Sequence, residues 1–220
     1  MNDPVPALVI VDMQNYYLKR DSSYYRFFDA LQPGCLDYLL ERCESVVLPN
    51  IQRLLAHFRG HKLPVLFLRL CGVDPERNDL HRFFQETYRK GKLAGFDDVY
   101  PLRNDRYADI VGEILPLPTE PVIEKTTFSP FTFTDFDKTL KNSGISILVC
   151  TGLATSQCVE TSARDASDRG YQIIHIEDAQ ADYDELSHHS SLFSSQGVCG
   201  GLVVSTEEYI QSGLNIIEKP

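Results

Sequence analysis

The sequence predicts an α/β fold of three layers, in which helices cover both faces of a six-stranded, mostly parallel, Rossmann-like sheet. Short apolar runs rich in Val, Ile and Leu alternate with stretches of helical periodicity, which is typical of repeated βα units around a buried parallel sheet. With 220 residues, 43% of them hydrophobic, the chain is expected to form one domain over 1–220. The expected strands are 7–11, 64–68, 121–123, 145–149, 171–176 and 201–204.

Three stretches between these runs carry helix signals. Apolar residues recur at helical spacing over 46–60, with Pro49 in an early turn. The segment 132–135 has the Thr and Asp spacing of a capping box and predicts a second helix that ends at Gly144. A third helix is expected over 156–168.

Two regions interrupt the alternation, and both are expected to be long loops or lids. Residues 16–40 form an insertion that is dense in Tyr and Phe, and residues 71–107 are polar, with Gly91 and Gly95. Two roles stay open for the aromatic side chains of 16–40, which either line a pocket or pack against another subunit.

Charge and cysteine content narrow the function classes. The formal net charge of -10 argues against nucleic acid or an anionic membrane as a partner, because their phosphates would be repelled. The six cysteines include no C-x-x-C pair, so free thiols are expected rather than a zinc knuckle. The amino terminus has neither a basic region followed by an apolar segment nor a membrane span, so we expect a cytoplasmic location.

Polar residues at the carboxyl ends of expected strands are the first candidates for function, because ligands of open α/β sheets bind there. Asp12 ends the first run, Lys125 follows the third, and Cys158 comes shortly after the fourth. Cys158 lies in the first turn of an expected helix, where free N–H groups, the dipole and a neighbouring ammonium favour a thiolate. We therefore expect a cysteine hydrolase acting on a small molecule.

Each of these residues has an expected role in acyl transfer. Asp12 takes the proton of the thiol and later gives it to the departing amine, and Lys125 holds the two negative charges together. Backbone N–H groups near Ala154 and at Cys158 form the oxyanion hole. The ordinary structural interpretation is a buried inert cysteine, an aspartate that caps a strand, and a solvated lysine.

Three segments, in this order, resemble the isochorismatase-like cysteine hydrolase superfamily. This superfamily includes nicotinamidases, N-carbamoylsarcosine amidohydrolases, and ureidoacrylate or biuret hydrolases. The blocks 125–137 and 161–171 are most similar to the branch that acts on ureido or biuret-type compounds. The three carrying segments are 9–15 (VIVDMQN), 124–131 (EKTTFSPF) and 151–160 (TGLATSQCVE).

The resemblance implies a catalytic triad of Asp12, Lys125 and Cys158 and a thioester intermediate released by water. It also implies a cis peptide between Leu153 and Ala154, which would turn an N–H toward the oxyanion, and a homo-oligomer, either a dimer or a tetramer. The substrate would be a small amide or a ureido compound.

Departures from the superfamily pattern refine this expectation. The nicotinamidase branch carries an Asp-x-His-x-x-His metal site, whereas 68–75 has no such pair and His81 stands alone, so no metal and no cofactor are expected. This departure disfavours nicotinamide as the substrate. Isochorismatases that cleave a vinyl ether lack the nucleophilic cysteine that Cys158 supplies here. Tyr16 also replaces an aspartate that is common in the superfamily.

Four residues near the triad motifs are candidates for substrate binding: Gln14, Arg69, Phe128 and Phe131. Arg69 ends the second expected strand and could bind a carboxylate through two nitrogens, but a structural salt bridge is the simpler interpretation.

Two other classes of function remain as alternatives. The C-x5-R spacing from Cys158 to Arg164 fits a cysteine phosphatase, but Glu160 and the lack of glycine between them disfavour a phosphate-binding loop. A non-catalytic binding or assembly member of the same fold is the second alternative. A haloacid-type phosphatase would need a second aspartate where Gln14 stands.

Overall fold

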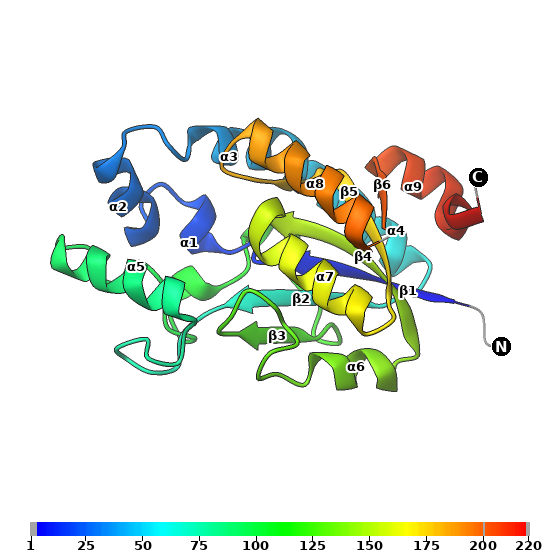
Figure 1. The fold of residues 1–220 in the computed structure, drawn as a ribbon, viewed down its shortest axis with the longest axis horizontal. Helices are drawn as coiled ribbons and strands as arrows, with labels where there is room; N and C mark the ends of the chain where they lie inside the picture. The colour runs from blue at the N-terminus through cyan, green and yellow to red at the C-terminus, as the bar shows by residue number, and fades with distance from the viewer. Residues whose placement is uncertain (1–3, 200, 219–220) are drawn as a thin grey trace.

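The computed structural model describes residues 4–199 and 201–218 and has a six-stranded sheet between two helical layers (Figure 1). All neighbouring strands are parallel, in the order β3-β2-β1-β4-β5-β6, which confirms the predicted fold class. The order reverses between β1 and β4, and a ligand site is expected at this point. The strands are β1 (Val5–Val11), β2 (Val65–Leu70), β3 (Val122–Lys125), β4 (Ile145–Leu153), β5 (Gln172–Ala181) and β6 (Leu202–Val204).

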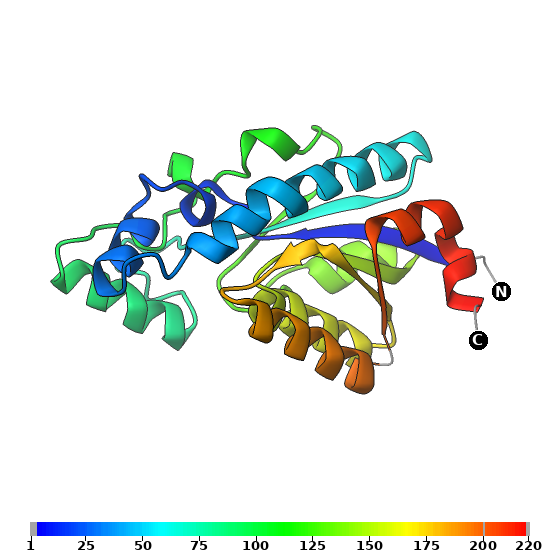
Figure 2. The ribbon, with the colours of Figure 1, turned by 90° about the horizontal axis from the view of Figure 1, so that it is seen from above.

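Helices cover the two faces of the sheet unequally (Figure 2). One face is covered by α4 (Leu48–Gly60) and α9 (Thr206–Ser212), and the other by α6 (Phe136–Asn142), α7 (Glu160–Asp168) and α8 (Glu185–Cys199). Each face has its own cluster of buried apolar side chains. Within the described ranges, no helix is long and apolar enough to cross a membrane.

Two of the three predicted helices differ from their expected starts. A π-helical turn, η1 (Cys43–Val47), joins α3 (Asp37–Arg42) to α4, so the helical stretch begins earlier than the apolar pattern suggested. The capping box expected at 132–135 is not formed. The Thr134 hydroxyl accepts the N–H of Phe136 at 3.1 Å, and the Asp135 side chain forms no capping bond.

The regions 16–40 and 71–107 differ from the expected loops because both contain helices. Residues 16–40 include α1 (Asn15–Leu18) and α2 (Ser23–Leu31), and 71–107 includes α5 (Arg82–Leu93). These three helices lie beyond the carboxyl ends of the strands in both views (Figures 1 and 2). The remaining short helices are η2 (Arg106–Ala108), η3 (Gly112–Ile114), η4 (Thr155–Val159) and η5 (Gly213–Glu218).

Candidate active site

Asp12, Lys125 and Cys158 meet at the carboxyl ends of β1, β3 and β4. Lys125 Nζ lies 2.7 Å from Asp12 Oδ2 and 3.2 Å from Cys158 Sγ. The ammonium also donates to the backbone carbonyl of Thr127 at 3.2 Å. Asp12 and Lys125 are 0% exposed and Cys158 is 1% exposed. The structure thus brings together the three residues that the sequence analysis selected.

Backbone geometry at the switch point between β1 and β4 places these side chains. Asp12 has a φ of 51°, in the left-handed region that non-glycine residues rarely adopt. Across the strand pair, Gly152 has a φ of 101°, and a Cβ there would lie 2.1 Å from the carbonyl oxygen of Val11. Only glycine therefore allows the ends of β1 and β4 to approach this closely.

The Cys158 turn, defined as residues 155–159, is held by Asp182, which directly follows β5, and by side chains of α8. Asp182 accepts the backbone N–H of Ser156 at 2.5 Å, and the Thr155 hydroxyl is 2.8 Å from His188 Nδ1. The Ser191 hydroxyl donates to the Thr155 carbonyl at 3.2 Å. These supports were not predictable from the sequence, because nothing in the local pattern links 182–191 to the turn.

His188 extends this support to a charged cluster on the other side of its ring. Its Nε2 lies 3.2 Å from Glu177 Oε1 and 3.0 Å from Arg42 Nη2. Ligand atoms of Glu177, His188 and His189 lie within 4.8 Å of one another, as in some metal sites. Arg42 already binds Glu177 at 2.6 Å and supplies the positive charge there, so the donor set fits a structural ion pair better than a metal ion.

Burial and the charges of the neighbouring groups together set the pKa values of the triad. Desolvation raises the pKa of Asp12 even though Lys125 lowers it. Desolvation also raises the pKa of the Cys158 thiol, and the charge of Asp12 adds to this, with Lys125 opposing it. Burial alone would lower the pKa of Lys125, but attraction to Asp12 and Cys158 raises it.

The raised pKa of Cys158 contradicts the expectation that its thiol is more acidic than usual. One buried ammonium balances one negative charge, and a second buried anion is disfavoured by desolvation. Burial and the charge of Asp12 therefore favour the thiol form of Cys158 over the thiolate. Burial of the thiol outweighs the helix end and the Lys125 ammonium, which the sequence indicated would lower the pKa of Cys158.

An aromatic cover closes over the triad; it consists of Tyr16, Tyr17, Tyr24, Tyr100 and Tyr183. A negative charge on Cys158 would raise the pKa of four of these phenols, those of Tyr16, Tyr17, Tyr100 and Tyr183. The cover is built by edge contacts, such as the 5.5 Å between the ring centroids of Tyr16 and Tyr24. The hydroxyls of Tyr24 and Tyr183 lie 2.8 Å apart and hold α2 to the segment after β5.

The candidate substrate-binding residues near β2 are engaged with the protein itself. The Gln14 amide donates to the carbonyls of Leu70 and Ala108 at 3.0 and 2.8 Å and accepts the N–H of Leu70 at 2.7 Å. Arg69 binds the carboxylate of Glu124, and its second terminal nitrogen is 3.4 Å from Asp109. Gln14 therefore joins the ends of β1 and β2, and Arg69 forms the structural salt bridge that was its simpler interpretation.

The two phenylalanine candidates lie in different surroundings. Phe131 packs against Phe136, with ring centroids 5.0 Å apart, and under the guanidinium of Arg169 at 4.7 Å. Phe128 packs against Phe84 of α5 at 4.6 Å, below the aromatic cover. Of the two, Phe128 is the one that contacts the elements beyond the strand ends.

The expected cis peptide between Leu153 and Ala154 is not found, and every peptide bond in the described ranges is trans. Ala154 is extended, with φ of -86° and ψ of 146°, and leads directly into the Cys158 turn. The unusual backbone conformation at this strand end is carried by Gly152 instead.

The C-x5-R interpretation has no support in the geometry. Arg164 donates to the carboxylate of Glu160 and, at 2.8 Å, to the hydroxyl of Ser194. Its guanidinium therefore binds α7 and α8, while the group beside Cys158 is the carboxylate-bound Lys125. A phosphate dianion at the thiol would also meet Asp12.

Comparison with known proteins agrees with this geometry. Residues 6–208 match the isochorismatase domain family. The chain is 31% identical over 219 residues to the ureidoacrylate amidohydrolase RutB of Variovorax paradoxus, which covers 94% of this chain and 80% of that protein. It is 25% identical over 195 residues to Nicotinamidase 3 of Arabidopsis thaliana, with 88% and 81% covered.

A solved structure shows the same fold. The isochorismatase family protein from Desulfovibrio vulgaris superposes with a TM-score of 0.78 at 21% identity, over 99% of this chain and 100% of that chain. The family match extends over most of the sequence, and the fold agrees with it. The chain belongs to the isochorismatase domain family.

Proposed function

We propose that the protein is a cysteine amidohydrolase that cleaves a small amide or ureido compound through a thioester on Cys158. One observation carries the proposal: a buried ammonium, that of Lys125, bridges a carboxylate and a thiol at the switch point of the sheet. Relatives named as a ureidoacrylate amidohydrolase and a nicotinamidase support hydrolysis of a C–N bond.

The first half-reaction forms the thioester. The thiol proton of Cys158 passes to Asp12 as the sulfur bonds to the substrate carbonyl, whose oxygen takes up the negative charge. N–H groups of Ala154 and Cys158 stabilise that charge. The C–N bond then breaks, and the proton on Asp12 passes to the nitrogen, which leaves as ammonia or an amine.

Water completes the cycle. Asp12, again unprotonated, accepts a proton from a water molecule. The oxygen of that water attacks the thioester carbonyl, and the C–S bond breaks. The proton returns to the sulfur and the acid product leaves. The raised pKa of Asp12 suits both directions of transfer, because a carboxyl group that is less acidic than usual donates and accepts nearer neutral pH. Lys125 keeps the single negative charge paired at every stage.

The test is a screen for ammonia release over small amides, ureido acids and biuret, run beside Cys158→Ala. Cys35→Ala is the matched control, because Cys35 is a half-buried thiol far along the chain from the site. We expect at least a 1,000-fold loss of kcat, that is about 4 kcal/mol, for Cys158→Ala and no change for the control. Hydrolysis that survives in Cys158→Ala would exclude the covalent route.

The non-catalytic alternative makes a different prediction. A chain that has kept the fold without the reaction would release no ammonia from any compound, and its Cys158 would be alkylated no faster than Cys35.

A further inference from the structure

Two polar atoms of the site have no hydrogen-bond partner. They are the hydroxyl of Tyr16 and the Oδ1 of Asp12, and both are buried. Leaving such a group unsatisfied costs about 1–3 kcal/mol, so unpaired polar groups in a closed site indicate atoms that a ligand will satisfy. Together they offer one hydrogen-bond donor and one acceptor.

Tyr16 is held so that its hydroxyl stays in the site. Its backbone carbonyl accepts the hydroxyl of Ser22 at 2.7 Å, and its ring packs on Tyr17, Tyr24 and Tyr100 with centroids 4.0, 5.5 and 5.9 Å away. By contrast, the Tyr24 hydroxyl of the same cover is paired with Tyr183.

The Tyr16 phenol stays protonated and lies close to the triad. Burial raises its pKa, and the charge of Asp12 raises it further, which places the hydroxyl within electrostatic reach of the carboxylate. The neighbouring Tyr17 hydroxyl opposes this shift but forms no hydrogen bond of normal geometry with Tyr16. A neutral phenol beside the triad is a hydrogen-bond donor to a substrate acceptor.

The charged side chains near the triad disfavour the binding of an anionic substrate. Lys125 is the cation of the triad and is bound to Asp12 and Cys158. The arginines of the neighbouring segments are also paired, Arg69 with Glu124 and Arg77 with Asp98. A substrate carboxylate beside the triad would therefore meet neutral phenols and a triad whose ammonium is already balanced by a negative charge.

We propose that Tyr16 orients the substrate by donating a hydrogen bond from its hydroxyl, and that the site takes an uncharged amide or urea rather than an anionic ureido acid. This rests on the proposed function. The Tyr16 hydroxyl binds a carbonyl oxygen of the substrate, and Asp12 Oδ1 accepts an N–H of the nitrogen that leaves.

Alkylation of Cys158 tests this without a known substrate. Iodoacetamide carries the carboxamide group and iodoacetate is its anionic counterpart of nearly equal size. The rate ratio of iodoacetamide to iodoacetate is measured for the protein and, under the same conditions, for glutathione. We expect the ratio at Cys158 to exceed that of glutathione at least tenfold. A ratio at or below that of glutathione would overturn the assignment of an uncharged substrate.

Tyr16→Phe tests the hydroxyl. We expect iodoacetamide to react about tenfold more slowly, as expected for one lost hydrogen bond, and iodoacetate to react at an unchanged rate. Tyr25→Phe is the matched control, because it removes from α2 a hydroxyl that is bonded only to the exposed Arg20. Equal slowing of both reagents, or none, would overturn the role of Tyr16.

Thermal unfolding separates this role from a structural one. Removing an unpaired buried hydroxyl is expected to keep or raise the Tm, whereas a structural phenol would lower it. None of these outcomes depends on ammonia release, so the inference can fail while the Cys158→Ala result upholds the proposed hydrolase, and the reverse also holds.

Discussion

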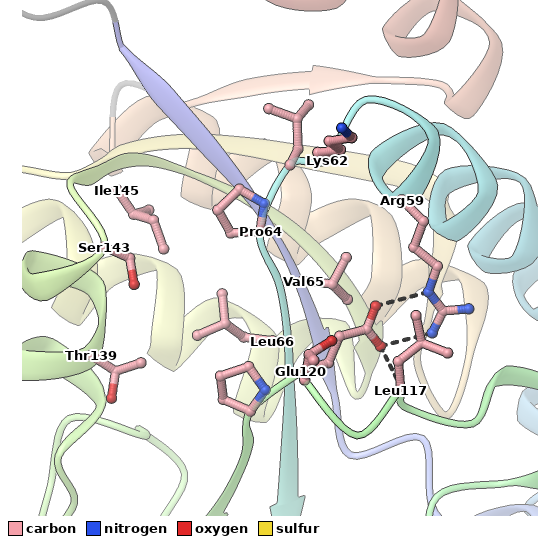
Figure 3. Close-up of a pocket in the computed structure, with 13 residues that line it drawn as sticks. Arg59, Lys62, Pro64, Val65, Leu66, Leu117, Glu120, Thr139, Ser143 and Ile145 are labelled. Atoms are coloured by element: carbon pink, nitrogen blue, oxygen red, sulfur yellow. Dashed lines mark hydrogen bonds and ion pairs between the residues drawn. The ribbon is translucent and has the colours of Figure 1, made fainter.

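The charged side chains at the two ends of the sheet differ in burial and in hydrogen bonding. At the carboxyl end, Asp12, Lys125 and Cys158 are wholly buried, and one carboxylate oxygen lacks a partner. At the amino end, the starts of β2 and β4 border a cavity of about 370 Å³ beside Arg59 and Glu120 (Figure 3). This cavity therefore lies at the end of the sheet that does not contain Cys158.

The ion pair at the amino end is fully satisfied. Arg59 binds Glu120 through two nitrogens, each at 2.8 Å, and also donates to the carbonyl of Leu115 at 3.0 Å. Glu120 accepts the N–H of Leu117 at 2.8 Å. A paired surface salt bridge contributes modest stability. A buried charged group with an unpaired oxygen lowers stability unless a ligand supplies the missing hydrogen bond. Hydrogen-bond completeness therefore distinguishes the end with the proposed catalytic residues from the structural end better than cavity size does.

The largest effect is expected for Lys125→Met. Removing one partner of a buried pair is expected to cost about 3–5 kcal/mol of unfolding free energy, because Asp12 would remain buried without a cation. Activity should fall below detection. The measurement is urea unfolding at pH 7 beside the activity assay.

A double variant and a pH series are the controls for Lys125→Met. Asp12→Asn combined with Lys125→Met should recover most of the stability but no activity, because it removes both charges. The pKa of Asp12 is raised in the folded state, so its protonation favours folding and the deficit of Lys125→Met should shrink as the pH falls. A deficit that stays constant with pH would contradict the buried-charge account.

An intermediate loss of stability is expected for Glu177→Gln, because Glu177 contacts His188, which in turn contacts Thr155 of the Cys158 turn. His188 and Arg42 lower the pKa of Glu177 to about 2, so the folded state favours its ionised form. The resulting stability is present above the ordinary pKa of glutamate, near 4.3, and is lost as the pH falls toward 2. Allowing for partial exposure, the variant should lose about 1–2 kcal/mol at pH 7.

Unfolding of the wild type and Glu177→Gln between pH 7 and pH 3 checks this. The two stability curves should converge as the pH falls, because the wild-type carboxylate then loses its advantage. Curves that stay parallel would show that Glu177 acts through shape rather than charge.

The strands and the meeting of Asp12, Lys125 and Cys158 were predictable because both depend on local patterns. Buried parallel strands appear as continuous apolar runs, and the residues that follow them must meet at one sheet edge. The contacts of Asp182 and His188 with the Cys158 turn were not predictable. They depend on how the end of β5 and α8 pack in the folded chain. The raised pKa of Cys158 was missed for a related reason, since it depends on α1 and α2 closing over the thiol, and those short aromatic helices were expected to be loops.

The smallest effect is expected at the amino end, from Glu120→Gln. This change keeps the shape of the side chain and removes the charge that Arg59 pairs with, so the unfolding free energy should fall by about 1 kcal/mol. The kcat/KM of the hydrolase should stay within twofold of the wild type, because no described contact joins Arg59 or Glu120 to the triad at the other end of the strands. A tenfold change in kcat/KM without further loss of stability would contradict this separation, because it would mean that the cavity in Figure 3 is coupled to the chemistry at Cys158 through the sheet.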